Sequence, residues 1–253
     1  SEIEKLEFTD DVTRIESECF KNTRLSGEID LSNITYIGQK GFIYDDNPDG
    51  AGNCKFIFSQ NPTVLHSHAF FGQANAEFEF NGEILLTPDD IYAFSYCKNL
   101  KEMPVIKGCI PEKTFWDCES LKEIKIGPDV YLGPGAFLKT TGVEKISVDS
   151  ANPHVFEKDG IFIYQDFLDD FGEMHLSYAM SSKCPQSVSV DERTTHITSC
   201  AFYGCNNLKE IDLMNIKRIN GSAFESCESL EKVTLKENSG GEIGERAFYE
   251  CKN

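Results

Sequence analysis

A single motif repeats along this chain and dictates how the chain can fold. The motif is clearest in residues 197–213, ITSCAFYGCNNLKEIDL, which have the form I-x-x-x-A-F-x-x-C-x-x-L-x-x-I-x-L. Further copies stand at 219–235 and 110–126, and weaker ones surround Phe20, Phe42, Phe70, Phe94 and Phe137. Successive motif phenylalanines are 22, 28, 24, 21, 22, 65, 22 and 24 residues apart. Such a period is typical of solenoids, so we expect stacked coils rather than a globule.

The L-x-x-I-x-L part of the motif predicts a short strand, because its apolar positions alternate with polar ones. One strand per coil, always in the same direction, would form a parallel sheet along one side of the solenoid. We expect the Ala-Phe part to form the opposite wall, as a short strand or a helical turn, with the phenylalanine filling the space between. The chain is therefore predicted to be one solenoid over residues 1–253, of α/β or mostly β class.

Two places break the period. In residues 41–58 and 160–178, an apolar aromatic segment enters a polar, turn-rich loop and a second apolar segment leaves it. This pattern predicts two inserted β-hairpins. An incomplete copy of the motif stands at each end, as Ile3–Phe8 and as a last copy that stops at Cys251, so we expect the sequence to be truncated at both ends.

Composition narrows the function classes. The chain has 42 acidic and 24 basic residues, a formal net charge of -18. Such a surface repels phosphate backbones and anionic membranes, so we predict no nucleic-acid partner. No segment approaches the roughly 20 apolar residues that cross a bilayer, so we predict no membrane insertion.

The ten cysteines follow the motif rather than a disulfide pattern. Five of them stand three residues after a motif phenylalanine: Cys97, Cys118, Cys205, Cys227 and Cys251. A residue type fixed to the register fills the same buried position in each coil, where a thiol acts as a small apolar group. We therefore favour free structural thiols. Coils stacked about 4.8 Å apart would nevertheless let an oxidising compartment link neighbours such as Cys205 and Cys227.

The repeated motif resembles the BspA-like class of leucine-rich repeats. The segment 148–153, with its Asn-Pro turn, followed by Asp159–Tyr164, is also similar to an interruption found in that family. The resemblance implies a right-handed array of about 22–24 residues per repeat, with its parallel sheet on one face. It implies a surface or secreted protein of bacteria or mucosal parasites that adheres to host proteins or cells. The sequence departs from the pattern at Asp89 and Pro104, so we expect irregular units near 86–106.

Enzyme motifs are absent: the sequence has no G-x-S-x-G, H-E-x-x-H or phosphate-binding glycine loop, and the resemblance supplies no catalytic residues or cofactor. The outward positions of the predicted strands are the favoured binding site, because one-sided arrays present them as a continuous surface. They carry no aromatic anchors of the kind that dominate binding energy. The predicted binding residues are Glu77, Glu79, Glu102, Glu123, Lys125, Lys145, Glu210, Asp212 and Lys232.

Two short patterns suggest metals. His66 and His68 could lie on one face of a strand and bind zinc or nickel, but no third ligand is evident. Asp45, Asn47 and Asp49, followed by Gly50, match the first half of a calcium loop. Polar hairpin tips use the same residues, and we favour that interpretation.

Three functions are compatible with these observations. The first is a non-enzymatic protein-interaction module at the cell surface, binding host extracellular-matrix or cell-surface proteins. The second is a structural spacer that displays another domain. The third, which we rank last, is a glycan-active or hydrolytic enzyme with a cleft beside the 160–178 hairpin.

Overall fold

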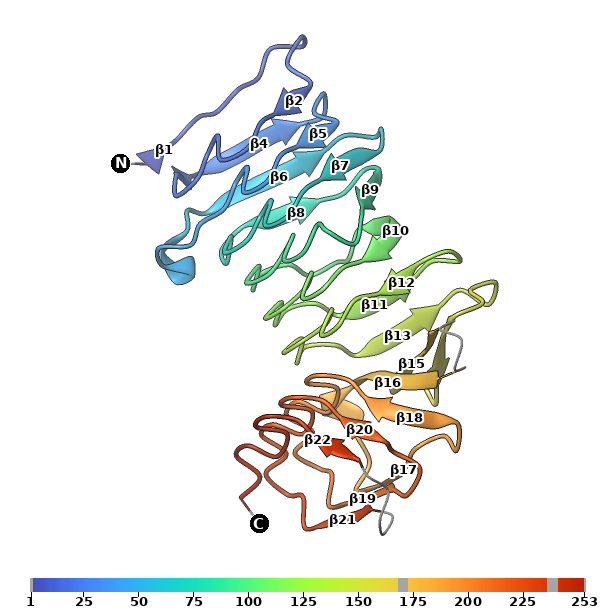
Figure 1. The fold of residues 1–253 in the computed structure, drawn as a ribbon. Helices are drawn as coiled ribbons and strands as arrows, with labels where there is room; N and C mark the ends of the chain where they lie inside the picture. Colours follow the sequence, from blue (N-terminus) through green and yellow to red (C-terminus); the bar gives the residue numbers. More distant parts are fainter. Residues whose placement is uncertain (1, 168–172, 236–240, 253) are drawn as a thin grey trace.

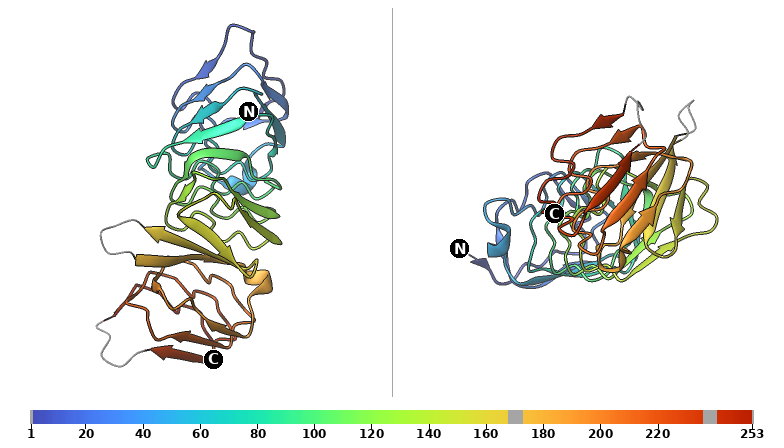
Figure 2. Two further views of the ribbon diagram at one scale, coloured as in Figure 1. Left: turned by 90° about the vertical axis from the view of Figure 1, so that its right-hand side faces the viewer. Right: turned by 90° about the horizontal axis from the view of Figure 1, so that it is seen from below.

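The computed structural model describes residues 2–167, 173–235 and 241–252. The coils stack into a long, narrow solenoid, and the two chain ends lie toward opposite ends of the stack (Figure 1, Figure 2). Short strands make up almost all of the regular structure, and the helical elements of the described residues are two 3-10 turns, η1 (Pro48–Gly50) and η2 (Ser181–Lys183). The predicted solenoid of stacked parallel strands is confirmed.

Each regular coil contributes strands to two rows, where the sequence predicted one. The leucine row follows the L-x-x-I-x-L segments and is divided into separate short sheets. Its strands are β1 (Glu2–Ile3), β3 (Arg24–Leu25), β4 (Gly27–Leu31), β6 (Cys54–Phe58), β8 (Glu77–Glu79), β11 (Glu123–Ile126), β13 (Lys145–Val148), β17 (Ser187–Ser189), β19 (Glu210–Leu213) and β21 (Lys232–Leu235).

The isoleucine row passes through the apolar residue that stands five positions before most motif phenylalanines. Its first six-stranded sheet comprises β2 (Arg14–Ile15), β5 (Tyr36–Ile37), β7 (Thr63–Leu65), β9 (Glu83–Leu86), β10 (Val105–Ile110) and β12 (Tyr131–Leu132). Its second comprises β14 (Val155–Lys158), β15 (Phe162–Phe167), β16 (Glu173–Ala179), β18 (Thr194–Ile197), β20 (Arg218–Ile219) and β22 (Glu242–Ile243).

The Ala-Phe segments connect the two rows and form neither strand nor helix. His68 (φ 59°) and Gly72 (φ 79°) flank Phe70 in the left-handed conformation. The backbone N–H of Phe70 donates to the carbonyl of Ala93 in the next coil at 2.9 Å, and that of Gly72 to Ser95 at 2.8 Å. Other coils repeat the left-handed pair at Glu18 and Asn22, Tyr92 and Tyr96, Lys113 and Asp117, Gly135 and Lys139, Cys200 and Gly204, Ser222 and Ser226, and Arg246 and Glu250. We call this hydrogen-bonded stack of turns the turn wall.

The motif phenylalanines stack inside the turn wall. One column comprises Phe20, Phe42, Phe70, Phe94, Phe115 and Phe137, whose neighbouring ring centroids lie between 5.0 and 5.7 Å apart. A second column comprises Phe202, Phe224 and Phe248, at 4.9 and 5.1 Å. The spacing is close to the distance of about 4.8 Å between paired strands. The same rise per coil therefore allows both ring stacking and backbone hydrogen bonding.

The cysteine of the motif also contributes to the coil-to-coil contact. The thiol of Cys97 donates to the carbonyl of Phe70 in the preceding coil at 3.2 Å. Where a coil lacks this cysteine, Gln73 donates from Nε2 to the carbonyl of Phe42 at 2.6 Å. All ten cysteines are free, and burial raises the pKa of Cys227 to about 12. The same thiol contact recurs from Cys118 to Phe94 at 3.1 Å, from Cys227 to Phe202 at 3.1 Å and from Cys251 to Phe224 at 3.2 Å.

The prediction of a β-hairpin at 41–58 is wrong. Phe42 belongs to the phenylalanine column, so the segment around it is a turn of the wall. The other half of the segment, β6, pairs in parallel with β4 and β8 as an ordinary strand of the leucine row. Residues 45–53, with η1, are an extended loop between these two parts. The apolar run 41–44 is compatible with a strand and with a buried turn, and the sequence alone does not distinguish the two.

The hairpin predicted at 160–178 is confirmed as β15 and β16, which pair antiparallel; its tip, 168–172, lies outside the described residues. Strand β14 pairs antiparallel with β15, and β16 pairs in parallel with β18. Buried Gln165 continues the ladder where the two six-stranded sheets meet: its side-chain amide accepts from the Leu132 N–H at 2.7 Å and donates to the Leu132 carbonyl at 3.2 Å.

The insertion also divides the core. The first phenylalanine column ends at Phe137, which meets Tyr178 edge to face at 6.0 Å. The second begins at Phe202, whose neighbour on the insertion is Phe162 at 6.1 Å. Apolar residues accordingly form one buried cluster from Ile15 to Met180 and another from Phe162 to Ala247.

The irregular unit expected near 86–106 is present. No leucine-row strand of the described residues lies between β8 and β11, and Val105 is 60% exposed although the motif predicts an inward side chain. Pro104 has no N–H to donate to a ladder, which explains the break. The Lys125 N–H accordingly donates to the sulfur of Met103 at 3.4 Å.

The thiol contact generates a stability prediction. We expect Cys118→Ala to lower the free energy of unfolding by about 1–2 kcal/mol, because it leaves a small cavity and removes a donor from a buried carbonyl. Cys19 is exposed, so Cys19→Ala should change stability by less than about 0.5 kcal/mol. Urea denaturation of the two variants measures both values. Equal effects would contradict a structural role for the motif cysteine.

Candidate binding site

The residues predicted as a binding face lie outside the core, but they do not form one continuous surface. The leucine row is broken at Pro104 and again at the insertion, so its strands form separate sheets. Glu77 and Glu79 lie on β8, Glu123 and Lys125 on β11, Lys145 on β13, Glu210 and Asp212 on β19, Lys232 on β21, and Glu102 in the bend before β10.

Many of these charges are paired with the neighbouring coil. Glu79 accepts from Lys55 at 2.6 Å, and this hydrogen bond lowers the pKa of the Glu79 carboxyl. Glu77 pairs with Lys101 at 3.3 Å. Glu123 contacts Lys145 and, at 3.6 Å, Lys125. Exposed pairs of this kind contribute little stability, about 0–1 kcal/mol each, but they occupy the groups that a partner would need.

The turn wall carries an aromatic surface that the sequence analysis missed. Five partly exposed side chains, His68, Phe71, Tyr92, Tyr96 and Trp116, lie side by side over three consecutive coils, and we call them the aromatic stripe. The ring centroids of His68 and Tyr92 are 4.8 Å apart, those of Phe71 and Tyr96 5.2 Å, and those of Tyr96 and Trp116 4.7 Å. These aromatic side chains lie on the turns, whereas none of the predicted binding residues on the leucine-row strands is aromatic.

The backbone of the turns explains the stripe. Its members stand two residues before, one after or two after a motif phenylalanine, and the left-handed residues of each turn occupy the first and last of these positions. The phenylalanine points inward, and its neighbours are left at the surface of the wall. The detectable signal was therefore an aromatic residue at these three offsets in successive copies of the motif.

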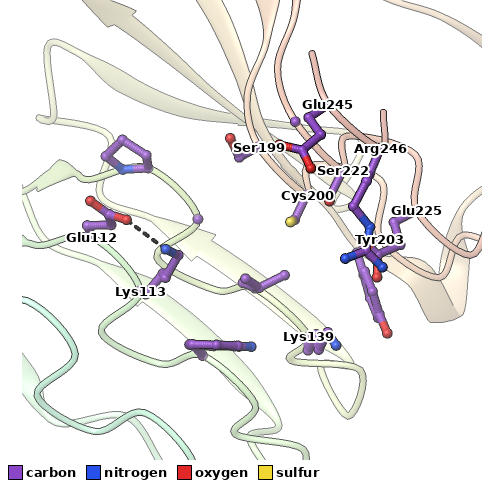
Figure 3. A pocket seen from close by; sticks show the side chains of 15 residues that line it. Glu112, Lys113, Lys139, Ser199, Cys200, Tyr203, Ser222, Glu225, Glu245 and Arg246 are labelled. Atoms are coloured by element: carbon purple, nitrogen blue, oxygen red, sulfur yellow. Dashed lines mark ion pairs between the residues drawn. The ribbon is translucent and has the colours of Figure 1, made fainter. Parts of the chain in front are cut away.

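The stripe runs into a cleft at the insertion. The cavity has a volume of about 420 Å³ and lies between coils on either side of the break (Figure 3). One wall contains Glu112, Lys113, Trp116, Pro134, Gly135, Leu138 and Lys139; the other contains Ser199, Cys200, Tyr203, Gly221, Ser222, Glu225, Glu245 and Arg246.

The cleft exists because the insertion supplies no Ala-Phe turn. Coils of the turn wall normally follow one another without a gap, but between the turns of Phe137 and Phe202 the chain has β14–β16 and η2. The Ala179 N–H nevertheless donates to the Ala201 carbonyl at 2.7 Å, which links the insertion to the following turn. The missing turn leaves the recess between the two walls.

Charged and aromatic groups are mixed inside the cleft. Lys139 spans it, with Nζ 4.9 Å from the ring centroid of Tyr203 on the opposite wall. Burial alone would lower the pKa of Lys139, but Tyr203 and the nearby carboxylates raise it above its usual value. Lys113 pairs with Glu112 at 2.9 Å. Both lysines are therefore cationic at neutral pH.

Trp116 offers a further polar group. Its indole Nε1 is buried and has no hydrogen-bond acceptor among the described residues. A buried donor without an acceptor is costly, so a ligand or water that accepts from it would be stabilised there. Aromatic faces, ammonium groups and carboxylates together suit the side chains of a polypeptide or a polar ligand. Among the described residues no histidine lines the cleft, and burial raises the pKa of Cys200 to about 11.

The structure does not bring the predicted metal ligands together. His66 Nδ1 lies 2.8 Å from the buried carboxylate of Asp90. His68 instead stacks on Tyr92 and contacts the Ser67 hydroxyl through Nδ1 at 2.7 Å. The two imidazoles belong to different contacts, because His68 has already entered the turn.

The calcium pattern is likewise divided among other partners. Asp45 accepts from the side-chain amide of Asn22 at 2.7 Å, and Asp49 pairs with Lys98 at 3.2 Å. Within the described part of the chain, the one group of three His, Cys, Asp or Glu side chains close enough to share an ion lies elsewhere, at Glu173, His175 and His196.

Comparison with known families supports the resemblance seen in the motif. The model of the BspA type leucine rich repeat region matches in six copies, over residues 1–48, 51–162 and 176–253. The chain belongs to this family. No curated protein sequence matches it.

Solved structures share the fold. The pneumococcal vaccine antigen PcpA is 24% identical with a TM-score of 0.66, and the match covers 89% of this chain and 56% of that one. A leucine-rich cell surface protein of Faecalibacterium prausnitzii is 18% identical with a TM-score of 0.69, covering 95% and 69%. A leucine-rich repeat protein of Eubacterium ventriosum is 18% identical with a TM-score of 0.61, covering 92% and 64%. The chain therefore spans just over half the length of PcpA.

Nothing in the described structure resembles a membrane-spanning helix, since neither 3-10 turn approaches the necessary length.

Trp116 is the chain's one tryptophan, so its fluorescence reports on the stripe and the cleft. We expect Tyr96→Ala to increase collisional quenching of this emission by acrylamide, because the neighbouring ring at 4.7 Å no longer shields the indole. Tyr131→Ala, at an exposed tyrosine of β12, is the matched control and should leave quenching unchanged. An unchanged quenching constant in both variants would contradict the described packing of the stripe.

Proposed function

We propose that this chain is a non-enzymatic binding module of a bacterial surface or secreted protein, and that it holds a partner protein on the aromatic stripe and in the adjoining cleft. The observation that carries the proposal is the row of partly exposed rings from His68 to Trp116, which leads into a recess lined by aromatic and charged side chains.

Energetic arguments favour this surface over the predicted sheet face. Binding energy at protein interfaces concentrates in a few aromatic and arginine side chains, which pack into pockets. The stripe has the aromatic groups, and Arg246 lies in the cleft. The outward strand positions instead carry short-range charge pairs such as Glu79 with Lys55. We keep Glu210 and Asp212 as the second candidate surface, since neither forms an ion pair within the described residues.

The family supports an extracellular partner. A cell surface protein and a vaccine antigen stand among the structures with this fold, which fits an address outside the cell. We therefore propose adhesion to host extracellular-matrix or cell-surface proteins, as the family resemblance implies. The spacer function is the competing proposal, and it requires no ligand.

The test is binding of the purified chain to immobilised matrix proteins and to host cells. We expect saturable binding that Tyr96→Ala combined with Trp116→Ala weakens at least about tenfold, the effect of losing about 1.4 kcal/mol of hot-spot energy. Tyr131→Ala is the matched control and should bind normally. Glu210→Lys combined with Asp212→Lys tests the sheet face in the same assay.

Each outcome selects one function. A loss confined to the sheet-face variant would move the binding surface to β19. No binding by the unmodified chain would favour the spacer. Hydrolysis of a glycan or peptide substrate that is abolished by Glu225→Gln would support the enzymatic alternative, which the cleft's carboxylates keep open.

A further inference from the structure

We propose that Glu173, His175 and His196 form a site for a divalent transition metal of the zinc class. The three side chains each offer one ligand atom, and these atoms all lie within 4.8 Å of one another. Two imidazoles and one carboxylate are a ligand set that zinc prefers, and three protein ligands leave one position open to water or a partner group.

The strands place the three donors on one face. Glu173 and His175 are two residues apart on β16, so their side chains point to the same side of the sheet. The buried residues Met174 and Leu176 alternate with them and point into the core. His196 lies on the neighbouring strand β18, in register with His175. Parallel pairing thus sets two imidazoles side by side with a carboxylate next to them.

The distances suit tetrahedral coordination. Nδ1 of His196 lies 3.3 Å from Oε2 of Glu173. Ligand bonds of about 2.0–2.1 Å at tetrahedral angles separate two ligand atoms by about 3.3 Å. The rings of His175 and His196 have centroids 4.3 Å apart and an interplanar angle of 31°, so the two imidazoles lie side by side. The side chains of His196 and Glu173 are 15% and 19% exposed, which leaves an approach for the ion.

Neighbouring groups position the carboxylate. Lys217 holds Oε1 of Glu173 at 3.1 Å and so directs the other oxygen toward His196. Such an outer contact orients a metal ligand. The ammonium group of Lys217 also repels a bound cation. The Thr195 hydroxyl lies 2.9 Å from Nδ1 of His196, and this contact must break before the nitrogen can bind a metal. Without a metal, the same residues form an ion-pair cluster, and this is the alternative to test.

A bound ion would join the insertion to the coils that follow it. Glu173 and His175 belong to the hairpin, whereas His196 belongs to the first strand after it. The metal would thus add a cross-link between β16 and β18, where the stack of regular coils resumes. This site is separate from the aromatic stripe and shares no residue with the cleft.

The experiment is calorimetric titration of the metal-free chain with zinc chloride at pH 7.5, in a Cys19→Ser background because an exposed thiol also binds zinc. We expect one equivalent to bind. His175→Gln and His196→Gln should each weaken binding at least about tenfold, and Glu173→Gln provides a third variant of nearly unchanged shape. The double variant His66→Gln, His68→Gln is the matched control and should retain the site.

Two further readouts separate a metal site from an ion-pair cluster. Cobalt(II) bound in zinc's place should give the visible absorption of a tetrahedral site, and zinc should raise the melting temperature of the parent chain but not of the His196→Gln variant. Binding should also weaken at acidic pH, because protons compete with the metal for the ligand nitrogens. No zinc binding, or equal binding after both His175 and His196 are replaced, would overturn the proposal.

Discussion

The hydrogen bond from the motif phenylalanine N–H of one coil to the next coil sets the geometry of the whole array. It is direct from Phe70 to Ala93 and from Phe224 to Ala247, at 2.9 and 2.7 Å. Because a left-handed pair flanks every motif phenylalanine except Phe42, which has only Lys40, alternate N–H groups of these turns point toward the next coil. The resulting rise per coil is about that of paired strands, which lets the rings stack and the two strand rows pair at the same spacing. Packing, thiol contacts and surface pattern all follow from this rise.

Much of this architecture was predictable from the sequence, because a repeated register reports burial directly. The apolar alternation located β11, β19 and β21, and the fixed place of the cysteine indicated its burial. The turn at 41–44 could not be predicted, because an apolar run has the same appearance in a strand and in a buried turn. The stripe was missed for a related reason: alternation indicates which strand residues face outward, but the exposure of turn residues depends on left-handed backbone conformations, which strand alternation does not report. The proximity of Glu173, His175 and His196 could not be predicted either. It depends on the register between β16 and β18, which is known only from the three-dimensional structure.

The insertion creates the distinctive sites of an otherwise repetitive molecule. Regular coils can only extend the same turn wall and the same strand rows. Where β15 and β16 replace an ordinary repeat, the sheet continues through the Gln165 amide while the turn wall does not. The insertion therefore affects the two sides of the coil differently. On the turn side there is a cleft, and on the strand side Glu173, His175 and His196 lie close together on adjacent strands. The interruption of the repeat thus produces local arrangements of side chains that the regular coils do not contain.

Charge distribution makes the cleft unlike the rest of the surface. The chain as a whole carries a formal charge of -18, so its field favours the approach of basic partners over acidic ones. The cleft is lined by Lys113, Lys139 and Arg246 together with Glu112, Glu225 and Glu245, so both signs are present in equal number. Beyond roughly 8–10 Å salt screens the overall field, and contact is then governed by these local groups. For the binding function proposed above, the net negative charge would favour basic partners near the surface, and the balanced cleft and its rings would select among them by shape and by paired charges.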